Sequence, residues 1–174
     1  MRVAICQSQF GSASAQALAT VAIGGYASLQ DHRRNQTMGK TFSTDRELRF
    51  GDCDISGTAY FPSYLNLLNG VNEEFWDHIG YPWHEIIWKD RWGTPTVHLT
   101  CDFSIPSFFG QTLTFELRVV KVGRSSVTLK HQINCGDEPR WNSTQVLAAS
   151  DLDKHISVPW PDEVRATLDQ WLDT

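Results

Sequence analysis

The chain has 174 residues, of which 41% are hydrophobic and 20% charged, and its formal net charge is −5. This length predicts one domain with its own hydrophobic core, and the apolar content excludes an intrinsically disordered chain. An acidic body argues against general nucleic-acid binding, which requires a basic face. No apolar run reaches the length of a membrane span. From the charge and from the apolar runs, respectively, we expect neither nucleic acid nor membrane as a partner.

The four cysteines, Cys6, Cys53, Cys101 and Cys135, are widely scattered and form no C-x-x-C pair. This scatter predicts free thiols in a reducing compartment, and therefore a cytoplasmic protein. It also disfavours a zinc site. The six histidines share no metal-ligand spacing, so neither a metal nor another cofactor is expected.

The first 40 residues differ from the rest of the chain. They are rich in Ala, Ser, Gln and Gly, have no sustained period, and carry four basic residues against Asp31 alone. We interpret residues 1–40 as a disordered extension, or as the product of a start codon assigned too early, with Met38 as a natural start. The ordered domain is expected over residues 41–174.

Regular periodicity begins with a strand predicted over residues 41–50. A polar loop over 51–60 follows, and then a helix that begins with Pro62, whose missing N–H does no harm in a first turn. Gly80 ends this helix. Helical spacing gives it one apolar stripe. The residues of this stripe are Leu65, Leu68, Phe75 and Ile79.

Alternation of apolar and polar residues predicts three further strands, over 97–105, 112–119 and 127–133. A less regular strand is predicted over 140–157, before a short closing helix. Short turns make such strands antiparallel neighbours, and the apolar face of one long sheet needs a cover. The helix over 62–79 is the only one long enough, so the pattern predicts an α+β domain with one buried helix.

The loop before the long helix contains the most distinctive polar cluster. Asp52, Asp54, Ser56 and Gly57 match the opening of an EF-hand calcium loop, but the twelfth position holds Ser63 where such loops have a bidentate Glu. Calcium is therefore disfavoured. From chemistry alone the two aspartates are turn and helix-capping residues, because their short acceptor side chains suit such positions.

A family resemblance changes this interpretation. Residues 50–64 read F-G-D-C-D-I-S-G-T-A-Y-F-P-S-Y. They resemble the signature of the 4-hydroxybenzoyl-CoA thioesterase family, roughly F-x-D-x-D-x-x-G-x-x-[YF]-[YF]-P-x-Y. The resemblance covers about residues 41–157 and includes the segments 93–95 and 124–126. It implies the hotdog fold, in which an antiparallel five-stranded sheet wraps around one long central helix.

The resemblance also implies an acyl-CoA thioesterase without a cofactor, acting on an aromatic (4-hydroxybenzoyl-like) or a short- to medium-chain acyl-CoA. It makes Asp54 the catalytic carboxylate, acting as nucleophile or as general base on water, with Asp52 structural. The backbone N–H of Phe61 is the implied oxyanion donor, because helix N-termini stabilise negative charge. Residues expected to contact the acyl group or CoA are Tyr60, Asn69, Thr94, Lys121, Arg124 and Ser126, with Lys130 a weaker candidate.

Two further points stay open in the sequence. Asn69 aligns with an acid in the bacterial enzyme specific for 4-hydroxybenzoyl-CoA, which leaves the preferred acyl group undecided. The turn that carries Arg124 is equally well read as a solvated hairpin. By resemblance the active protein is a homodimer or a dimer of dimers, with its site between subunits.

Two alternative functions compete with hydrolysis. One is a non-catalytic acyl-CoA-binding hotdog protein, which would be signalled by loss of the acidic residue. The other is a hotdog dehydratase, which would place a His before the central helix, and residues 50–62 contain none.

Overall fold

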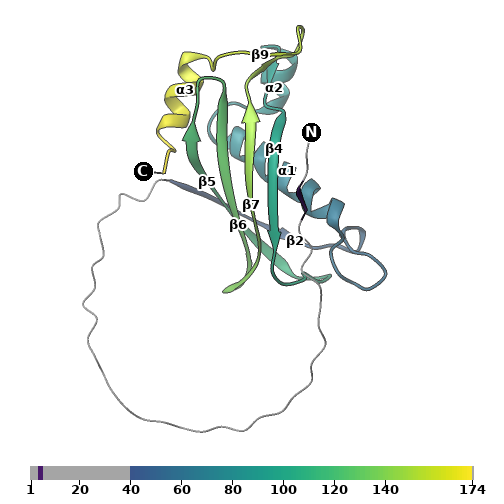
Figure 1. Ribbon diagram of the computed structural model, residues 1–174. Coiled ribbons are helices and arrows are strands. Elements are labelled where there is room, and N and C mark those ends of the chain that lie inside the picture. Colours follow the sequence, from purple (N-terminus) through teal and green to yellow (C-terminus); the bar gives the residue numbers. More distant parts are fainter. Residues whose placement is uncertain (1–3, 6–39, 174) are drawn as a thin grey trace, which may run out of the picture.

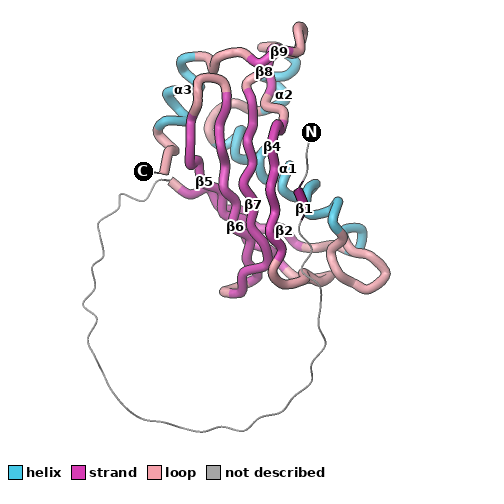
Figure 2. Tube along the Cα trace, viewed as in Figure 1, coloured by secondary structure: helices cyan, strands magenta, loops and turns pink. Residues whose placement is uncertain are grey.

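The computed structural model describes residues 4–5 and 40–173 (Figure 1 and Figure 2). Apart from β1 and Lys40, residues 1–40 lie outside this description, and so do the expectations stated for them. The elements in chain order are β1 (Ala4–Ile5), β2 (Thr41–Glu47), the 3₁₀ turn η1 (Phe50–Asp52), α1 (Phe61–His78), α2 (Trp83–Trp88), β3 (Trp92–Gly93), β4 (Thr96–Phe103), β5 (Thr112–Val122), β6 (Ser126–Cys135), β7 (Glu138–Ala148), β8 (Ser150–Asp151), β9 (Ile156–Ser157) and α3 (Asp162–Asp169).

The main sheet has the strand order β1-β4-β7-β6-β5-β2. All pairs from β4 to β2 are antiparallel, and together they are the five-stranded sheet that the sequence and the family resemblance predict. The two-residue strand β1 adds to the β4 edge in parallel, with Ala4 opposite Thr100. The predicted α+β class and the hotdog arrangement are confirmed.

Helix α1 lies across one face of this sheet, as Figure 1 shows. Its buried face is wider than the predicted stripe, because it also includes polar residues. The buried residues are Ser63, Tyr64, Leu68, Val71, Asn72, Phe75 and Trp76. Of the predicted stripe, Leu65 and Ile79 are only half-buried, so the helix is rotated slightly from the orientation that apolar spacing alone predicts.

The predicted alternation is clearest on β5. Leu113, Phe115, Leu117 and Val119 have no exposed surface, while the residues between them are at least partly accessible. They pack against α1 in one core, and full burial of each such side chain stabilises the fold by about 1.5–3 kcal/mol. The long central helix is therefore held by the sheet face that the period-two pattern identifies.

The single strand predicted over residues 140–157 is wrong in its second half. Strand β7 ends at Ala148, and the chain then leaves the main sheet to form β8 and β9. These two strands and β3 make a separate three-stranded sheet. The turn between β8 and β9 holds His155 at a φ of 56°, and Asp151 accepts the backbone N–H groups of Asp153 (3.0 Å) and Lys154 (2.9 Å).

Candidate active site

The loop between η1 and α1 is closed by its own backbone. The N–H of Asp54 donates to the carbonyl of Thr58 (2.9 Å), and the N–H of Gly57 donates to the carbonyl of Asp54 (2.9 Å). Gly57 has a φ of 77°, a conformation that a residue without Cβ adopts at no steric cost. The N–H of Tyr60 donates to the carbonyl of Asp52 (3.1 Å), so the ends of the loop are tied together.

The carboxylate of Asp54 points into solvent and accepts hydrogen bonds from within its own loop. Its Oδ1 accepts the Ser56 N–H (2.8 Å) and the Ser56 hydroxyl, with the Thr58 hydroxyl at 3.4 Å. The hydrogen bonds from Ser56 are the main reason why the pKa of Asp54 lies below its usual value. The side chain is therefore an ionised, accessible carboxylate at neutral pH.

Asp52, two residues earlier, is used differently. Its Oδ2 accepts the backbone N–H of Arg49 (2.9 Å), which closes η1. Its carbonyl already accepts the Tyr60 N–H. Asp52 holds the loop in place while Asp54 remains accessible.

The backbone N–H of Phe61, at the start of α1, is uncommitted. Pro62 has no N–H, and the N–H of Ser63 donates to the carbonyl of Tyr60 (2.9 Å). The N–H of Phe61 makes no hydrogen bond to the described residues. It lies at the positive end of the dipole of an 18-residue helix, where negative charge is stabilised.

The same loop is supported by the segment that joins β4 to β5. The N–H of Ala59 donates to the carbonyl of Ser107 (2.8 Å), and the N–H of Phe109 donates to the carbonyl of Gly57 (3.0 Å). Large apolar side chains around this junction are exposed, which is unusual for so many neighbouring residues in a monomer. They are Phe50, Ile55, Tyr60, Phe61, Phe108 and Phe109.

A pocket of about 530 Å³ opens between α1, α2 and the strands β3, β4 and β8. Its size falls in the range of small-molecule sites, and most of its surface is apolar. It brings together Asn69 of α1 and Thr94, two residues that the family resemblance assigns to substrate binding. The other lining residues are Trp83, Ile87, Gly93, Pro95, Thr96, Ser150, Asp151, Leu152 and His155.

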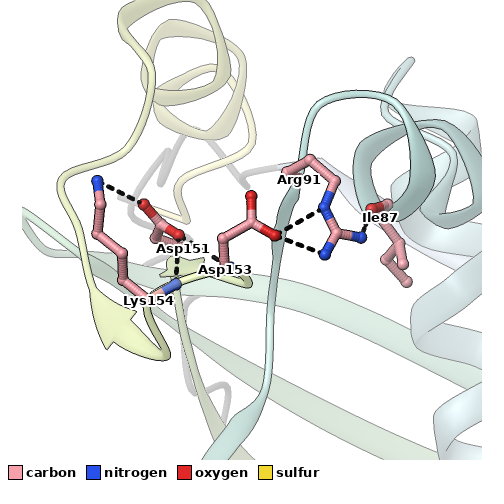
Figure 3. Close-up of polar contacts among 5 residues, drawn as sticks. All are labelled: Ile87, Arg91, Asp151, Asp153 and Lys154. Carbon is pink, nitrogen blue, oxygen red and sulfur yellow. Dashed lines mark hydrogen bonds and ion pairs between the residues drawn. The ribbon is translucent and has the colours of Figure 1, made fainter.

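One rim of this pocket is held by the polar contacts in Figure 3. Arg91 donates to Asp153 Oδ1 from Nε (3.0 Å) and Nη2 (2.7 Å), and its Nη1 donates to the carbonyl of Ile87 (3.2 Å). The ion pair with Asp153 raises the pKa of Arg91, and the backbone N–H of Lys154 lowers the pKa of Asp151. These contacts fix the β8–β9 turn against the end of α2.

The proposed CoA-contacting residues lie away from Asp54. Strand β5 begins beside the Asp54 loop and ends at the turn that carries Arg124, and its 11 residues span about 35 Å. In that turn, the carbonyls of Arg124 and Ser126 accept the two N–H groups of Trp160, at 3.0 and 3.2 Å. Lys121 lies at the same end of the sheet.

The weaker candidate, Lys130, lies elsewhere again. It lines a polar pocket of about 430 Å³ on β5, β6 and β7, together with Glu116 and Arg118. Within one chain, Asp54 lies in the loop that ends at Phe61, and Asn69 and Thr94 line the same pocket. Lys121, Arg124 and Ser126 lie at the far end of β5 from Asp54.

Several lining residues were not predicted from the sequence. Thr96, for example, lies just before the strand predicted over residues 97–105, and no motif pointed to it. The sequence did hold one signal of a polar site in the core. Polar residues occupy inward positions of otherwise apolar elements, as at Asn72 and Gln145. The pocket itself depends on the small β3-β8-β9 sheet, which has no pattern of its own in the sequence.

Within residues 4–5 and 40–173, no three His, Cys, Asp or Glu side chains gather into a potential metal site. In the same part of the chain, no helix has the length and apolarity needed to span a membrane.

Comparison with known proteins places this geometry in a family. The model of the Thioesterase-like superfamily matches residues 48–168. The 4-hydroxybenzoyl-CoA thioesterase of Pseudomonas is 25% identical over 99 residues, covering 56% of this chain and 70% of that protein. The 1,4-dihydroxy-2-naphthoyl-CoA hydrolase of Nostoc punctiforme is 24% identical over 142 residues, covering 77% and 88%.

A solved structure of a 1,4-dihydroxy-2-naphthoyl-CoA thioesterase from Synechocystis has the same fold. Its TM-score is 0.69 at 19% identity, and the match covers 75% of this chain and 96% of that one. Fold and relatives together define the class, a thioester-hydrolysing enzyme of the hotdog fold. The chain belongs to the Thioesterase-like superfamily, as the resemblance of residues 50–64 predicted.

Proposed function

We propose that the protein is an acyl-CoA thioesterase that uses Asp54 on an aromatic acyl-CoA. The observation that carries the proposal is the ionised, exposed carboxylate of Asp54 in the loop that leads into α1, at whose first position the N–H of Phe61 is uncommitted. A thioester carbonyl requires both a nucleophile and a donor for its developing negative charge, and this loop supplies one of each.

Two routes fit this geometry. In the first, Asp54 Oδ attacks the carbonyl carbon, the C–S bond breaks, CoA leaves as a thiolate, and water hydrolyses the resulting anhydride to free acid and Asp54. In the second, Asp54 takes a proton from water as the water oxygen attacks the carbonyl carbon, the C–S bond then breaks, and CoA leaves with the proton that Asp54 returns. In both, the Phe61 N–H donates to the carbonyl oxygen as it becomes negative. The lowered pKa of Asp54 keeps its carboxylate ionised, which both routes require.

The pocket and the relatives support an aromatic acyl group. Trp83, Ile87 and Leu152 supply flat and apolar walls that suit an aromatic ring. Relatives are named for 4-hydroxybenzoyl-CoA and 1,4-dihydroxy-2-naphthoyl-CoA, both aromatic acyl thioesters. Asn69 offers an amide to the ring where the resemblance expects an acid, so we propose an aryl-CoA without fixing its ring system.

We further propose that the active form is a homodimer or a dimer of dimers. The distance along β5 keeps Lys121, Arg124 and Ser126 from reaching a CoA bound to Asp54 of the same chain, whereas a second copy can supply them. The exposed apolar side chains around the Asp54 loop, Phe50 and Ile55 among them, support burial against that copy. Light scattering coupled to size-exclusion chromatography tests this, and a purely monomeric active enzyme would exclude it.

The direct test of function is release of CoA thiol from benzoyl-, 4-hydroxybenzoyl-, 1,4-dihydroxy-2-naphthoyl- and hexanoyl-CoA. We expect turnover of at least one aryl-CoA, and at least a hundredfold loss of kcat in Asp54→Asn. Asp137→Asn, an exposed aspartate in the β6–β7 hairpin, is the matched control with unchanged rate. If no thioester is turned over, the better interpretation is a non-catalytic acyl-CoA-binding protein.

Two further proposals concern the whole chain. Cys53, Cys101 and Cys135 are unpaired in the structure, which supports a reducing, cytoplasmic location. We also propose that residues 41–174 are sufficient for activity. A chain that starts at Met38 should then match the full chain in kcat and KM, and mass spectrometry of the native amino terminus would identify the true start.

A further inference from the structure

A hydrogen-bonded series of buried polar side chains runs from Ser143 on β7, through β6 and α1, to the pocket. Ser143 and His131 are joined at 3.0 Å, His131 and Asn72 at 3.1 Å, and Asn72 and Gln145 at 2.8 Å. Gln145 then donates to the hydroxyl of Thr96 at 2.8 Å. The first four residues are each at most 4% exposed, whereas Thr96 is half-buried and lines the pocket.

Each hydrogen bond in this series has a definite direction. Burial lowers the pKa of His131 to about 3, so its ring is neutral and carries one proton. Its Nε2 faces the carbonyl oxygen of Asn72, which can only accept, so the proton is on Nε2, and Nδ1 accepts from Ser143. The Asn72 amide donates to the Gln145 carbonyl oxygen, and the Gln145 amide donates to Thr96.

The direction of the series determines what Thr96 can do. Its oxygen already accepts a hydrogen bond from the Gln145 amide, and no other hydrogen bond of this hydroxyl is found in the described part of the chain. Its own proton is therefore free to be donated on the pocket side. Trp83 also lines the pocket, but its indole N–H is buried. The uncommitted donor that the pocket presents is therefore the Thr96 hydroxyl.

We propose that Thr96 determines the specificity of the acyl pocket by donating a hydrogen bond to an oxygen substituent on the aryl ring, with its hydroxyl oriented by Gln145. This rests on the proposed function and deepens it, because it selects hydroxylated aryl groups over unsubstituted ones. A site with a fixed polar partner discriminates strongly, since the unsubstituted ring leaves the donor desolvated and unpaired.

A purely structural role for this series of side chains predicts a different effect of mutation on substrate preference. If Gln145 only fills the core, loss of the Thr96 hydroxyl lowers stability and affects all acyl groups alike. If Thr96 donates to the substrate, its loss changes the ratio of kcat/KM between hydroxylated and unsubstituted substrates. The ratio is therefore the informative quantity, and it is insensitive to the amount of folded enzyme.

The experiment measures kcat/KM for benzoyl-CoA and its 2-, 3- and 4-hydroxy derivatives, and for 2-naphthoyl-CoA and its 1-hydroxy derivative. The wild type should prefer at least one hydroxylated substrate over its parent by about tenfold, which corresponds to about 1.4 kcal/mol. Thr96→Val should abolish that preference, and Thr96→Ser should retain it. Thr128→Val, an equivalent change on β6 at a residue that does not line the pocket, should leave it unchanged.

Two outcomes overturn the inference while leaving the proposed function intact: a wild type with no preference for any hydroxylated substrate, or a Thr96→Val variant that keeps the preference. If Thr96→Val does not fold, Thr96→Ala makes the same test, because its smaller side chain leaves room for water at the Gln145 amide.

Failure of all the thioesters to react would reject the proposed function alone. Thr96 is then tested by calorimetric binding of benzoate against the hydroxybenzoates. A preference for a hydroxylated acid that Thr96→Val removes supports the inference, and equal binding refutes it.

Discussion

His131, the buried histidine of the polar series from Ser143 to Thr96, makes the stability of this protein depend on pH in a defined window. His131 is neutral in the folded state, with a pKa of about 3, against 6.5 for an accessible histidine. Protonation therefore favours the unfolded chain. The contribution of His131 is fully present above pH 6.5 and is lost progressively as the pH falls toward 3.

The size of this effect follows from proton linkage. Each pH unit below 6.5 lowers the free energy of unfolding by about 1.4 kcal/mol, so the loss between pH 7 and pH 5 is about 2 kcal/mol. This is a substantial share of a typical domain stability of about 5–15 kcal/mol. The lowered carboxyl pKa values of Asp54, Glu74 and Asp151 act only at lower pH, because their unfolded values are 3.8 or 4.5.

Urea unfolding followed by tryptophan fluorescence, at fixed protein concentration and at pH 7, 6 and 5, measures this loss. His131→Gln is the matched variant, since it keeps a donor toward Asn72 but does not titrate. We expect the wild type to lose about 2 kcal/mol across this range and the variant to lose much less. Parallel pH dependences in the two proteins would refute the assignment of a neutral, buried His131.

Three other changes have definite expected outcomes. Ser56→Ala removes the hydroxyl hydrogen bond that lowers the pKa of Asp54, so the acid limb of the pH–kcat/KM profile should move to higher pH; an unmoved limb would contradict this control by Ser56. Phe75→Ala empties a fully buried site and should cost about 3–5 kcal/mol in urea unfolding, so a loss below 1 kcal/mol would contradict the core described here. Gly57→Ala meets no atom within 4 Å but must adopt a φ of 77°, so it should cost about 1–2 kcal/mol, whereas Gly51→Ala should not; equal melting temperatures would show that the loop relaxes.

The sheet and the central helix were predictable because their signals are local. Leu113 to Val119 alternate strictly, and such a pattern has few alternatives to a half-buried strand. The strand predicted over 140–157 failed in its second half because the chain leaves the main sheet after Ala148, and residues 153–157 are exposed. Which sheet a short segment joins is decided by tertiary packing, so apolar spacing alone does not reveal the break.

The site was predictable only in part, for the same reason. The resemblance of residues 50–64 selected Asp54 from Asp52, and the structure adds a physical difference between them. Asp54 is the more exposed of the two, whereas the Asp52 carboxylate accepts the backbone N–H of Arg49. The pocket was not predictable, because Thr96 and Gln145 are 49 positions apart and meet only through strand pairing. A polar residue at an inward position indicates that it has a hydrogen-bond partner, but the sequence does not identify that partner.

The donor at the start of α1 has an evolutionary consequence. The proposed contribution of Phe61 to the reaction comes from its backbone N–H, and every residue except proline has that group. Mutation of position 61 therefore leaves the donor in place, while the half-exposed side chain is free to change with the substrate or the partner subunit. Selection should instead preserve the conformation of the turn, which depends on Gly57 and Pro62. For this step of the reaction, the residues under constraint are therefore neighbours of position 61.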